Sequence, residues 1–312
     1  MGKRKLLVIC GPTAVGKTRL AIRLAKKFDG EVVSADSRQV YKKMNIGTGK
    51  DLPENFEFRI SNFEFKDVHI AYFTDGNIRL WGYDLVEPCE EFSVHDYAEF
   101  FDKVSSDIWS RGKLPILAGG TGFYIKAVLD GVETMEVPRN YELRRYLEKK
   151  NVKELYEQLC NLDSSKAASL NQSDKKNPRR LVRAIEVAQW RIDHGKGLKK
   201  KMRGGVESYL VGLTMPMVRL DKVIEQRVEK RVADGFDEEV RRLVADGIGW
   251  ECQAMSGLGY KQWQDVIDGQ SDESEAISIW KMHEKKYARR QMSWFKKDER
   301  IVWFDVSKWY KI

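Results

Sequence analysis

One short segment of the 312-residue chain combines residue types that bind phosphate. Gly11–Thr18 fits the pattern G-x-x-x-x-G-K-[ST], in which glycines let the backbone curl so that its N–H groups face phosphate oxygens. Lys17 adds a positive charge, and the Thr18 hydroxyl can bind Mg²⁺. An ordinary glycine-rich turn is the alternative, but an apolar run before the segment and a helical pattern after it favour the motif. The segment therefore predicts a polyphosphate site, without indicating which polyphosphate.

A carboxylate and a second glycine-rich segment follow two other apolar runs. Asp36 comes directly after Glu31–Ala35, and Gly119–Gly122 follows Leu114–Ala118. Ligands of open α/β sheets bind beyond the carboxyl ends of the strands, so both segments are expected near the phosphate loop. Asp36 could hold a metal, orient a hydroxyl or act as a general base, and a helix cap is its structural alternative. A phosphate-loop ATPase usually carries an acid where this chain has Gly119–Gly122, whose hydroxyl and amides suit a diphosphate instead.

The elements that position these residues follow from hydrophobic spacing. Lys5–Cys10 and Glu31–Ala35 are typical of buried strands, and the helical spacing of Gly16–Phe28 completes a βαβ unit. Alternating apolar residues and an Asp75-Gly76 turn predict a hairpin-like excursion within residues 50–83. Further helices are expected at Ser93–Trp109, Arg219–Ala245 and Trp280–Phe295, and further strands at Leu114–Ala118 and Leu210–Leu213.

The middle of the chain has a different character. From about residue 139 to 205 the pattern is helical, basic and poor in strand formers, and strand character returns near residue 210. The predicted fold class is α/β, with a P-loop-containing parallel sheet core and an inserted, mostly helical domain. The predicted core spans residues 1–138 and 206–312, including C-terminal helices, and the insertion spans residues 139–205.

Positive charge is concentrated in the predicted insertion. The whole chain has a net charge of +8, and residues 139–205 hold 18 Lys and Arg against 8 Asp and Glu. Two basic runs stand out, Lys175–Arg183 and Lys199–Arg203. Such a concentrated field attracts a polyanion, and nucleic acid is the commonest one in the cytosol, whereas a solvated helical surface is the alternative. Aromatic and basic residues interleaved in Trp280–Phe295 add to the expectation of RNA binding.

Composition excludes several classes of protein. With 42% hydrophobic and 33% charged residues the chain is not a disordered or low-complexity one. No apolar run approaches the ~18 residues that a membrane span needs, so we expect a cytoplasmic protein without a membrane partner. The four cysteines show no paired spacing, and we expect reduced thiols with neither a zinc site nor disulfides. They are Cys10, Cys89, Cys160 and Cys252.

Several segments together resemble the tRNA dimethylallyltransferase (tRNA isopentenyltransferase) family. They occur in the family's order and are Gly11–Thr18, Ser34–Tyr41, Met44–Lys50, Ala118–Tyr124, Asn177–Glu186 and Gly257–Tyr260. The resemblance implies transfer of a dimethylallyl group from dimethylallyl diphosphate to N6 of the adenosine just 3′ of the anticodon, at tRNA position 37. It also implies Mg²⁺ as cofactor, the anticodon stem-loop of tRNA as partner, and a phosphate loop that holds the prenyl diphosphate.

The same resemblance implies a role for each matching residue. Asp36 matches the base that takes a proton from the weakly nucleophilic amine, and Thr121 and Arg227 match groups beside the leaving diphosphate. The residues implied for diphosphate binding are Gly11, Thr13, Ala14, Val15, Gly16, Lys17 and Thr18, and Thr18 is also the implied metal ligand. The acceptor base must be flipped out of the anticodon loop. The residues implied for tRNA binding are Asp36, Ser37, Arg38, Gln39, Arg144, Arg179, Arg180, Leu181, Val182, Arg183, Ser256 and Lys261.

Other interpretations stay open on the residues alone. Prenyl transfer to a free adenine nucleotide would use the same core without needing the basic insertion or the aromatic-basic C-terminal helix. A small-molecule kinase would carry a second metal acid and an arginine-rich lid, and a non-catalytic RNA-binding ATPase is a further alternative. The chain departs from the family pattern at residues 51–83, which look like an insertion, and at Met217, where many members have Arg. A monomer is expected.

Overall fold

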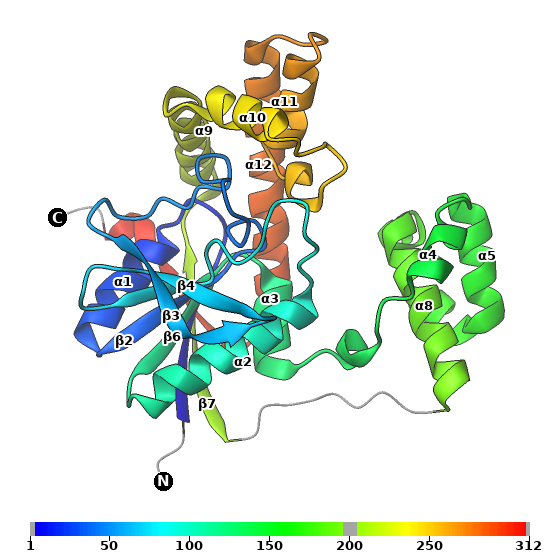
Figure 1. The fold of residues 1–312 in the computed structure, drawn as a ribbon, viewed down its shortest axis with the longest axis horizontal. Helices are drawn as coiled ribbons and strands as arrows, with labels where there is room; N and C mark the ends of the chain where they lie inside the picture. Colours follow the sequence, from blue (N-terminus) through cyan, green and yellow to red (C-terminus); the bar gives the residue numbers. More distant parts are fainter. Residues whose placement is uncertain (1–3, 196–204, 310–312) are drawn as a thin grey trace. The chain divides into compact units, whose positions relative to one another are not determined.

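A computed structural model describes residues 4–195 and 205–309 (Figure 1). These residues form two compact units. The sheet unit comprises the described residues up to Leu129 and from position 205 onward, and the helical unit comprises those from Asp130 onward to position 195. The basic run expected at Lys199–Arg203 lies outside the described residues.

The sheet unit is built on one mixed sheet with the strand order β3-β4-β5-β2-β6-β1-β7-β8. Neighbouring strands are parallel from β5 to β8, whereas β3, β4 and β5 pair antiparallel. Cys10 of β1 and Ala35 of β2 both lie opposite Gly119 of β6, so these three strands end at the same edge. The strands are β1 (Arg4–Cys10), β2 (Gly30–Ala35), β3 (Glu57–Phe65), β4 (Val68–Thr74), β5 (Arg79–Trp81), β6 (Leu114–Gly119), β7 (Val206–Thr214) and β8 (Ile301–Asp305).

Helices α1 and α2 pack on the strands of this sheet. Helix α2 begins at Ser93, which forms a capping box with Asp96, as the serine at this position predicts. The helices of the sheet unit are α1 (Lys17–Lys27), α2 (Val94–Ser110), α3 (Gly122–Asp130), α9 (Met217–Ala233), α10 (Phe236–Ala245), η2 (Gln253–Ser256), α11 (Tyr260–Ile267), α12 (Glu273–Phe295) and η3 (Val306–Lys308). The helical unit contains η1 (Glu133–Glu136), α4 (Tyr141–Leu147), α5 (Val152–Leu162), α6 (Ser164–Ser169), α7 (Gln172–Lys175) and α8 (Pro178–His194).

Three features differ from the expected elements. The helix expected over residues 219–245 is two helices, α9 and α10, because Gly235 between them takes a left-handed φ of 97°. Within the expected hairpin-like excursion, β3 and β4 are joined by a turn at Lys66 and Asp67, both with positive φ. The expected Asp75-Gly76 turn is confirmed, and it joins the antiparallel strands β4 and β5. Strand β8 at the sheet edge is an addition to the expected elements.

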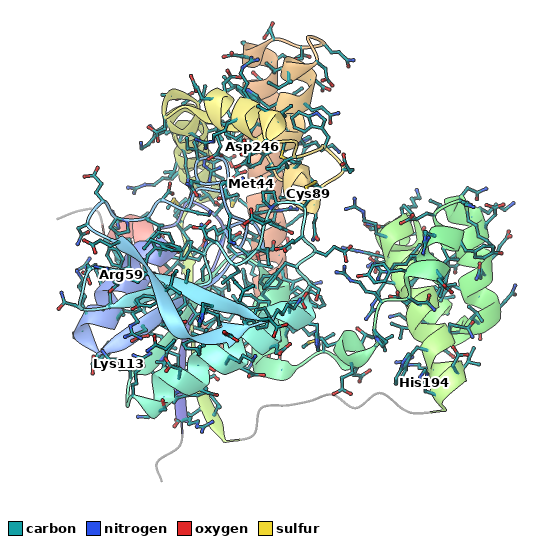
Figure 2. All side chains as sticks on the ribbon, in the orientation of Figure 1. Met44, Arg59, Cys89, Lys113, His194 and Asp246 are labelled. Carbon is teal, nitrogen blue, oxygen red and sulfur yellow. A yellow bond between two sulfur atoms is a disulfide. The ribbon has the colours of Figure 1, made fainter. Side chains whose placement is uncertain are left out.

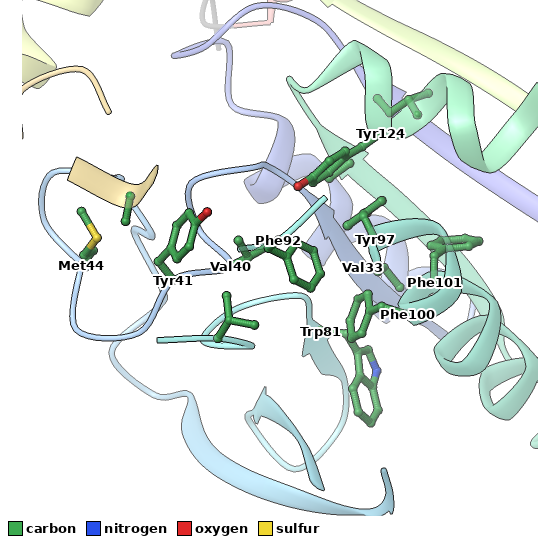
Figure 3. Packing of buried hydrophobic residues seen from close by; sticks show 14 of the residues in the cluster. Val33, Val40, Tyr41, Met44, Trp81, Phe92, Tyr97, Phe100, Phe101 and Tyr124 are labelled. Atoms are coloured by element: carbon green, nitrogen blue, oxygen red, sulfur yellow. The ribbon is translucent and has the colours of Figure 1, made fainter. Parts of the chain in front are cut away.

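Aromatic packing under the sheet edge fixes the end of β2. Tyr97 of α2 stacks on Tyr124 of α3 with ring centroids 4.0 Å apart, and Phe100 lies in the same cluster (Figure 3). The Tyr97 hydroxyl is buried and donates a hydrogen bond to the carbonyl of Ser34 at 2.7 Å. Since Ser34 stands two positions before Asp36, the core determines where this carboxylate leaves the sheet.

The helical unit has its own core, which includes Leu155 of α5 and Leu181 of α8. Beside it lies the buried carboxylate of Glu186, which accepts hydrogen bonds from Arg144 at 2.8 and 2.9 Å and a further one from Arg183. Burial raises the pKa of Glu186, but the hydrogen bonds from Arg144 and the backbone outweigh it and hold the pKa below its ordinary value. Two arginines are thus engaged inside this unit.

Two cysteines correct the expectation of reduced thiols. Cys89, labelled in Figure 2, forms a disulfide with Cys252, 163 positions further along the chain. The fold brings together the segment before α2 and the segment before η2, a pairing that sequence spacing does not reveal. Cys10 and Cys160 are free thiols, and burial raises the pKa of Cys10 to about 12.

Candidate active site

The loop between β1 and α1 has a backbone suited to an anion. Gly11, Ala14 and Gly16 take positive φ angles of 136°, 65° and 84°. No side chain caps α1 at Gly16, so the positive end of the helix is open to a ligand. A Cβ on Gly11 would lie 2.3 Å from the carbonyl oxygen of Leu213, so the loop passes this close to β7 only with glycine.

Two side chains of this loop are held by defined partners. The Nζ of Lys17 donates to the carbonyl of Pro12 at 2.6 Å. Burial lowers the pKa of Lys17 to about 8, although the nearby Asp36 carboxylate opposes that shift. The backbone N–H of Thr13 donates to Oε1 of Gln291 at 2.8 Å, and its hydroxyl accepts from Arg227 at 2.9 Å. Thr13 is therefore a meeting point of the loop with helices α9 and α12.

Asp36 and Thr121 are neighbours at the sheet edge. The Oδ1 of Asp36 accepts the N–H of Arg38 at 2.8 Å, which fixes the carboxylate over its own turn. The Thr121 hydroxyl accepts the N–H of Ser37 at 3.0 Å, and the Thr121 N–H donates to the carbonyl of Ala35 at 3.1 Å. Asp36 and Thr121, both expected to be catalytic, are thus connected through the backbone of Ala35 and Ser37.

A guanidinium group from α9 joins the phosphate loop to the segment around Gly49. Besides Thr13, Arg227 donates to the carbonyl of Gly49 at 3.2 Å and to the carboxylate of Asp51 at 2.6 Å. Burial raises the pKa of Asp51, but Arg227, Arg231 and Lys230 together outweigh burial, and the pKa lies below its ordinary value. A Cβ on Gly49 would meet guanidinium nitrogens of Arg227 and Arg231 within 2.4 Å, so these side chains lie directly against bare backbone.

Glu239 organises the segment that faces Arg227, a role that the sequence did not indicate. Its buried carboxylate accepts the backbone N–H groups of three successive residues at 2.7, 2.8 and 3.0 Å, and the Tyr260 hydroxyl at 2.6 Å. The three N–H donors belong to Asn45, Ile46 and Gly47. On sequence alone a glutamate near the start of a helix is typical of a solvated charge favoured by the helix dipole, so the pattern concealed this contact.

These groups surround one cavity of about 990 Å³. The sequence-predicted residues that line it are Thr13, Ala14, Gly16, Lys17, Thr18, Asp36, Ser37, Arg38, Gln39, Arg227 and Ser256. Val15 is buried in the core and does not line the cavity. The predicted residues Gly11, Thr121 and Lys261 do not line it either. Additional lining comes from residues that were not predicted, among them Arg231, Tyr287 and Gln291.

The aromatic and basic residues of α12 serve largely to hold the fold. Trp280 and Phe295 are buried, so they offer no stacking surface to RNA. Three cations of α12 pair with acids of α9 in what we call the α9–α12 ladder, with N–O distances of 2.5 Å for Lys281–Glu229 and 2.7 Å for Arg289–Asp221, and Lys285–Glu225 between them. These residues of the interleaved pattern therefore serve helix packing, whereas Tyr287 and Arg290 line the cavity and Trp294 is exposed.

The residues predicted to bind tRNA within the helical unit fall into two groups. Arg179 and Arg180 are exposed at the start of α8, where Arg180 pairs with Asp174. Arg144 and Arg183 instead hold Glu186, as described above. The side chain of Leu181 is fully buried in the core of this unit, so the predicted contact with tRNA would have to come from its backbone. Val182 is half-buried.

Two classes of site find no support in the part of the chain that the structure describes. There, no group of three or more His, Cys, Asp or Glu side chains could hold a metal ion. Within the same residues, no helix has the length and apolar character needed to cross a membrane. The candidate chemistry therefore rests on the cavity.

Comparisons with known proteins agree on one family. A family model described as IPP transferase matches residues 39–298, and one described as isopentenyl transferase matches residues 4–62. A curated tRNA dimethylallyltransferase from Geobacillus thermodenitrificans is 37% identical, with 97% of this chain and 91% of that protein covered. Another from Acetivibrio thermocellus is 36% identical, with 97% of this chain and 92% of that protein covered.

Solved structures give the same result. The crystal structure of the full-length tRNA isopentenylpyrophosphate transferase from Bacillus halodurans has a TM-score of 0.66 at 32% identity, and the match covers 97% of this chain and 90% of that one. The structure of a eukaryotic dimethylallyltransferase acting on tRNA has a TM-score of 0.74 at 23% identity, and the match covers 99% of this chain and 76% of that one. That protein therefore shares the fold. The chain therefore belongs to the IPP transferase family.

Proposed function

We propose that this protein is a tRNA dimethylallyltransferase, which transfers a dimethylallyl group from dimethylallyl diphosphate to N6 of the adenosine at tRNA position 37. The observation that carries the proposal is that Asp36, Arg227 and three residues of the anion-suited loop, Thr13, Ala14 and Gly16, line one cavity. A base and a polyanion site therefore face the same space. The names of the curated relatives support the choice of both substrates. We further propose that the enzyme acts as a cytoplasmic monomer.

The phosphate loop and Arg227 hold the diphosphate. The loop offers N–H groups and the positive end of α1, and Lys17 and Arg227 approach the same cavity with positive charge. As the bond from the prenyl carbon to the diphosphate oxygen breaks, negative charge grows on the leaving group. Donors placed in advance where charge develops lower the barrier more than donors that must reorganise.

Asp36 removes the proton of the acceptor amine. The N6 lone pair forms the new bond to the first carbon of the dimethylallyl group, that carbon releases the diphosphate, and Asp36 accepts the N6 proton. The N–H of Arg38 on Oδ1 orients the carboxylate. Ser37, Arg38 and Gln39 follow on the same cavity wall and surround the flipped base.

The donor set around Thr18 suits Mg²⁺. The Thr18 hydroxyl and the Asp36 carboxylate line the same cavity and are both oxygen donors. Mg²⁺ usually binds through one or two carboxylates and substrate phosphates while keeping several waters, so it needs no cluster of acids. When bound, the ion supplies charge neutralisation to the diphosphate.

The exposed cations of the chain contact the tRNA backbone. Arg179 and Arg180 stand at the start of α8, and Arg290 is exposed on α12 beside the cavity. Lysine and arginine contacts to phosphates supply sequence-independent affinity. Specificity then comes from the residues that surround the extruded base.

The decisive assay follows labelled dimethylallyl diphosphate into tRNA, free AMP or neither. We expect label in tRNA, no ADP release from added ATP, and a loss of at least about 100-fold in turnover for Asp36→Asn. Binding of tRNA by that variant is expected to stay within twofold of the unsubstituted protein, because affinity rests on basic residues. Glu54→Gln, at an exposed acid outside the cavity, is the matched control and should turn over normally.

Three results would count against this proposal. Label in AMP alone would indicate a free-nucleotide prenyltransferase. Stoichiometric ADP release would indicate a kinase. Equal loss of tRNA binding and turnover in Asp36→Asn would remove the role of that residue as base.

A further inference from the structure

The amide of Gln291 on α12 joins the two loops that form one wall of the cavity. The side chain is 6% exposed. Its Oε1 accepts the Thr13 N–H at 2.8 Å, and its Nε2 donates to the carbonyl of Gly120 at 2.9 Å. The amide therefore uses its acceptor on the loop after β1 and its donor on the loop after β6. An amide is the side-chain group that can satisfy a backbone N–H and a backbone C=O at once.

The backbone is shaped to receive this side chain. A Cβ on Gly120 would lie 2.2 Å from Nε2 of Gln291, so the amide packs against a position without a side chain. Gly120 directly precedes Thr121, whose hydroxyl is bound to the N–H of Ser37. A displacement of Gly120 would therefore move Thr121 and, through it, the turn that carries Asp36.

The other end of the bridge reaches the phosphate loop at the backbone N–H of Thr13. Thr13 also receives Arg227 on its hydroxyl at 2.9 Å. Gln291 and Arg227 thus fix the backbone and the side chain of the same residue from two different helices. The residues Ala14 and Gly16, which follow Thr13 and line the cavity, are therefore anchored at this residue.

We propose that Gln291 is a positioning residue, which sets the spacing between the phosphate loop and the loop of Thr121 and so tunes the affinity for the diphosphate group. This inference rests on the proposed function and adds a residue to it. Gln291 touches neither reacting atom, and it acts through Thr13 and Gly120. Its loss should weaken the diphosphate side of the reaction and spare the tRNA side.

Two variants separate this role from simple support of the fold. Gln291→Leu removes both hydrogen bonds at similar volume. Gln291→Glu keeps the acceptor for Thr13 but turns a carboxylate oxygen toward the carbonyl of Gly120, where it regains a donor only when protonated. Ser293→Ala is the matched control on the same helix, because the Ser293 hydroxyl donates to the α12 carbonyl of Arg289 and touches neither loop.

The measurements are calorimetric binding of inorganic diphosphate and KM values for both substrates. For Gln291→Leu we expect roughly tenfold weaker diphosphate binding and a similar rise in the KM for dimethylallyl diphosphate, with the KM for tRNA within twofold. For Gln291→Glu we expect the defect to shrink as the pH falls from 8 to 6. Ser293→Ala should match the unsubstituted protein in all of these.

Diphosphate affinity within twofold of normal in a folded Gln291→Leu protein would overturn the proposal. If that variant does not fold, the glutamate variant decides, and a defect independent of pH overturns it. If the unsubstituted protein shows no prenyl transfer but the Gln291 variants still lose diphosphate affinity, the proposed function is refuted and the positioning role of Gln291 stands. No binding of inorganic diphosphate by the unsubstituted protein would overturn both.

Discussion

Replacing Glu239 with alanine is expected to lower the free energy of unfolding by about 4 kcal/mol. The carboxylate accepts four hydrogen bonds, three from successive backbone N–H groups and one from the Tyr260 hydroxyl. Each donor left without a partner costs about 1 to 3 kcal/mol when buried. We take the lower limit for each of the four, because two of the N–H groups are only partly buried and can bind water in the variant.

Glutamine at position 239 should cost about a quarter as much, because one of the four donors loses its acceptor. Its carbonyl oxygen can still accept the N–H groups of Asn45 and Ile46, and its NH₂ group can donate to a Tyr260 hydroxyl that has turned around. The N–H of Gly47 then loses its acceptor. Burial raises the pKa of Tyr260 well above its ordinary value, and the adjacent Glu239 carboxylate adds to the shift, so this hydroxyl stays protonated and can take either role.

Urea denaturation of the purified protein measures both effects. Glu238→Ala, at the exposed neighbouring position, is the control and should lie within about 0.5 kcal/mol of the unsubstituted protein. The KM for dimethylallyl diphosphate should rise in Glu239→Ala, because Arg227 bonds to the carbonyl of Gly49 in the segment that Glu239 holds. A loss below about 1 kcal/mol, or equal losses for alanine and glutamine, would refute the hydrogen-bond reasoning.

Three further outcomes are expected. Because burial lowers the pKa of Lys17 to about 8, its positive charge is lost as the pH rises through that value. Affinity for inorganic diphosphate should therefore fall above pH 8 in the unsubstituted protein and stay constant in Lys17→Arg. A parallel fall in both proteins would exclude Lys17 as the cause. Arg180→Ala should weaken tRNA binding and reduce the slope of log affinity against log salt concentration by about 1, as fluorescence titration can show. Arg183→Ala should mainly lower the free energy of unfolding, by about 2 kcal/mol, as urea denaturation can show. The reverse pattern would contradict the contacts of the helical unit. Cys89→Ser should lower the unfolding free energy by about 2 to 4 kcal/mol, and dithiothreitol should bring the unsubstituted protein to the same value; equal melting temperatures with and without reductant would argue against the disulfide to Cys252.

The elements nearest the phosphate loop were predictable because their signals are local. The strand expected at Lys5–Cys10 is observed at Arg4–Cys10, and the helix expected at Gly16–Phe28 is observed at Lys17–Lys27. Apolar runs closed by glycine mark these boundaries, and the serine at position 93 marks the start of α2 in the same way. Local signals failed at Gly235, where a single glycine in a continuous helical pattern divides two helices.

The parts of the site that depend on tertiary contacts could not be predicted. Glu239 and Gln291 bind backbone groups more than 170 positions away, and no spacing rule connects them to their partners. The charges of α12 could not be sorted for the same reason, since the paired Lys281, Lys285 and Arg289 have the same sequence pattern as the exposed Arg290. Family resemblance identified Arg227, and the contacts with Thr13 and Asp51 then gave that residue a structural setting.

The α9–α12 ladder leaves the sliding register of these two helices under-determined. Its acids and its cations each recur every fourth residue, so a slip of one turn, about 5.4 Å, would re-form two of the three ion pairs. Exposed pairs contribute only about 0 to 1 kcal/mol each, too little to forbid that alternative. The observed alignment is held in addition by the buried pair Arg231–Glu284, whose nitrogen and oxygen lie 3.6 Å apart, and by Thr13, which contacts Arg227 of α9 and Gln291 of α12. The phosphate loop thus contacts both helices and helps to fix their relative register.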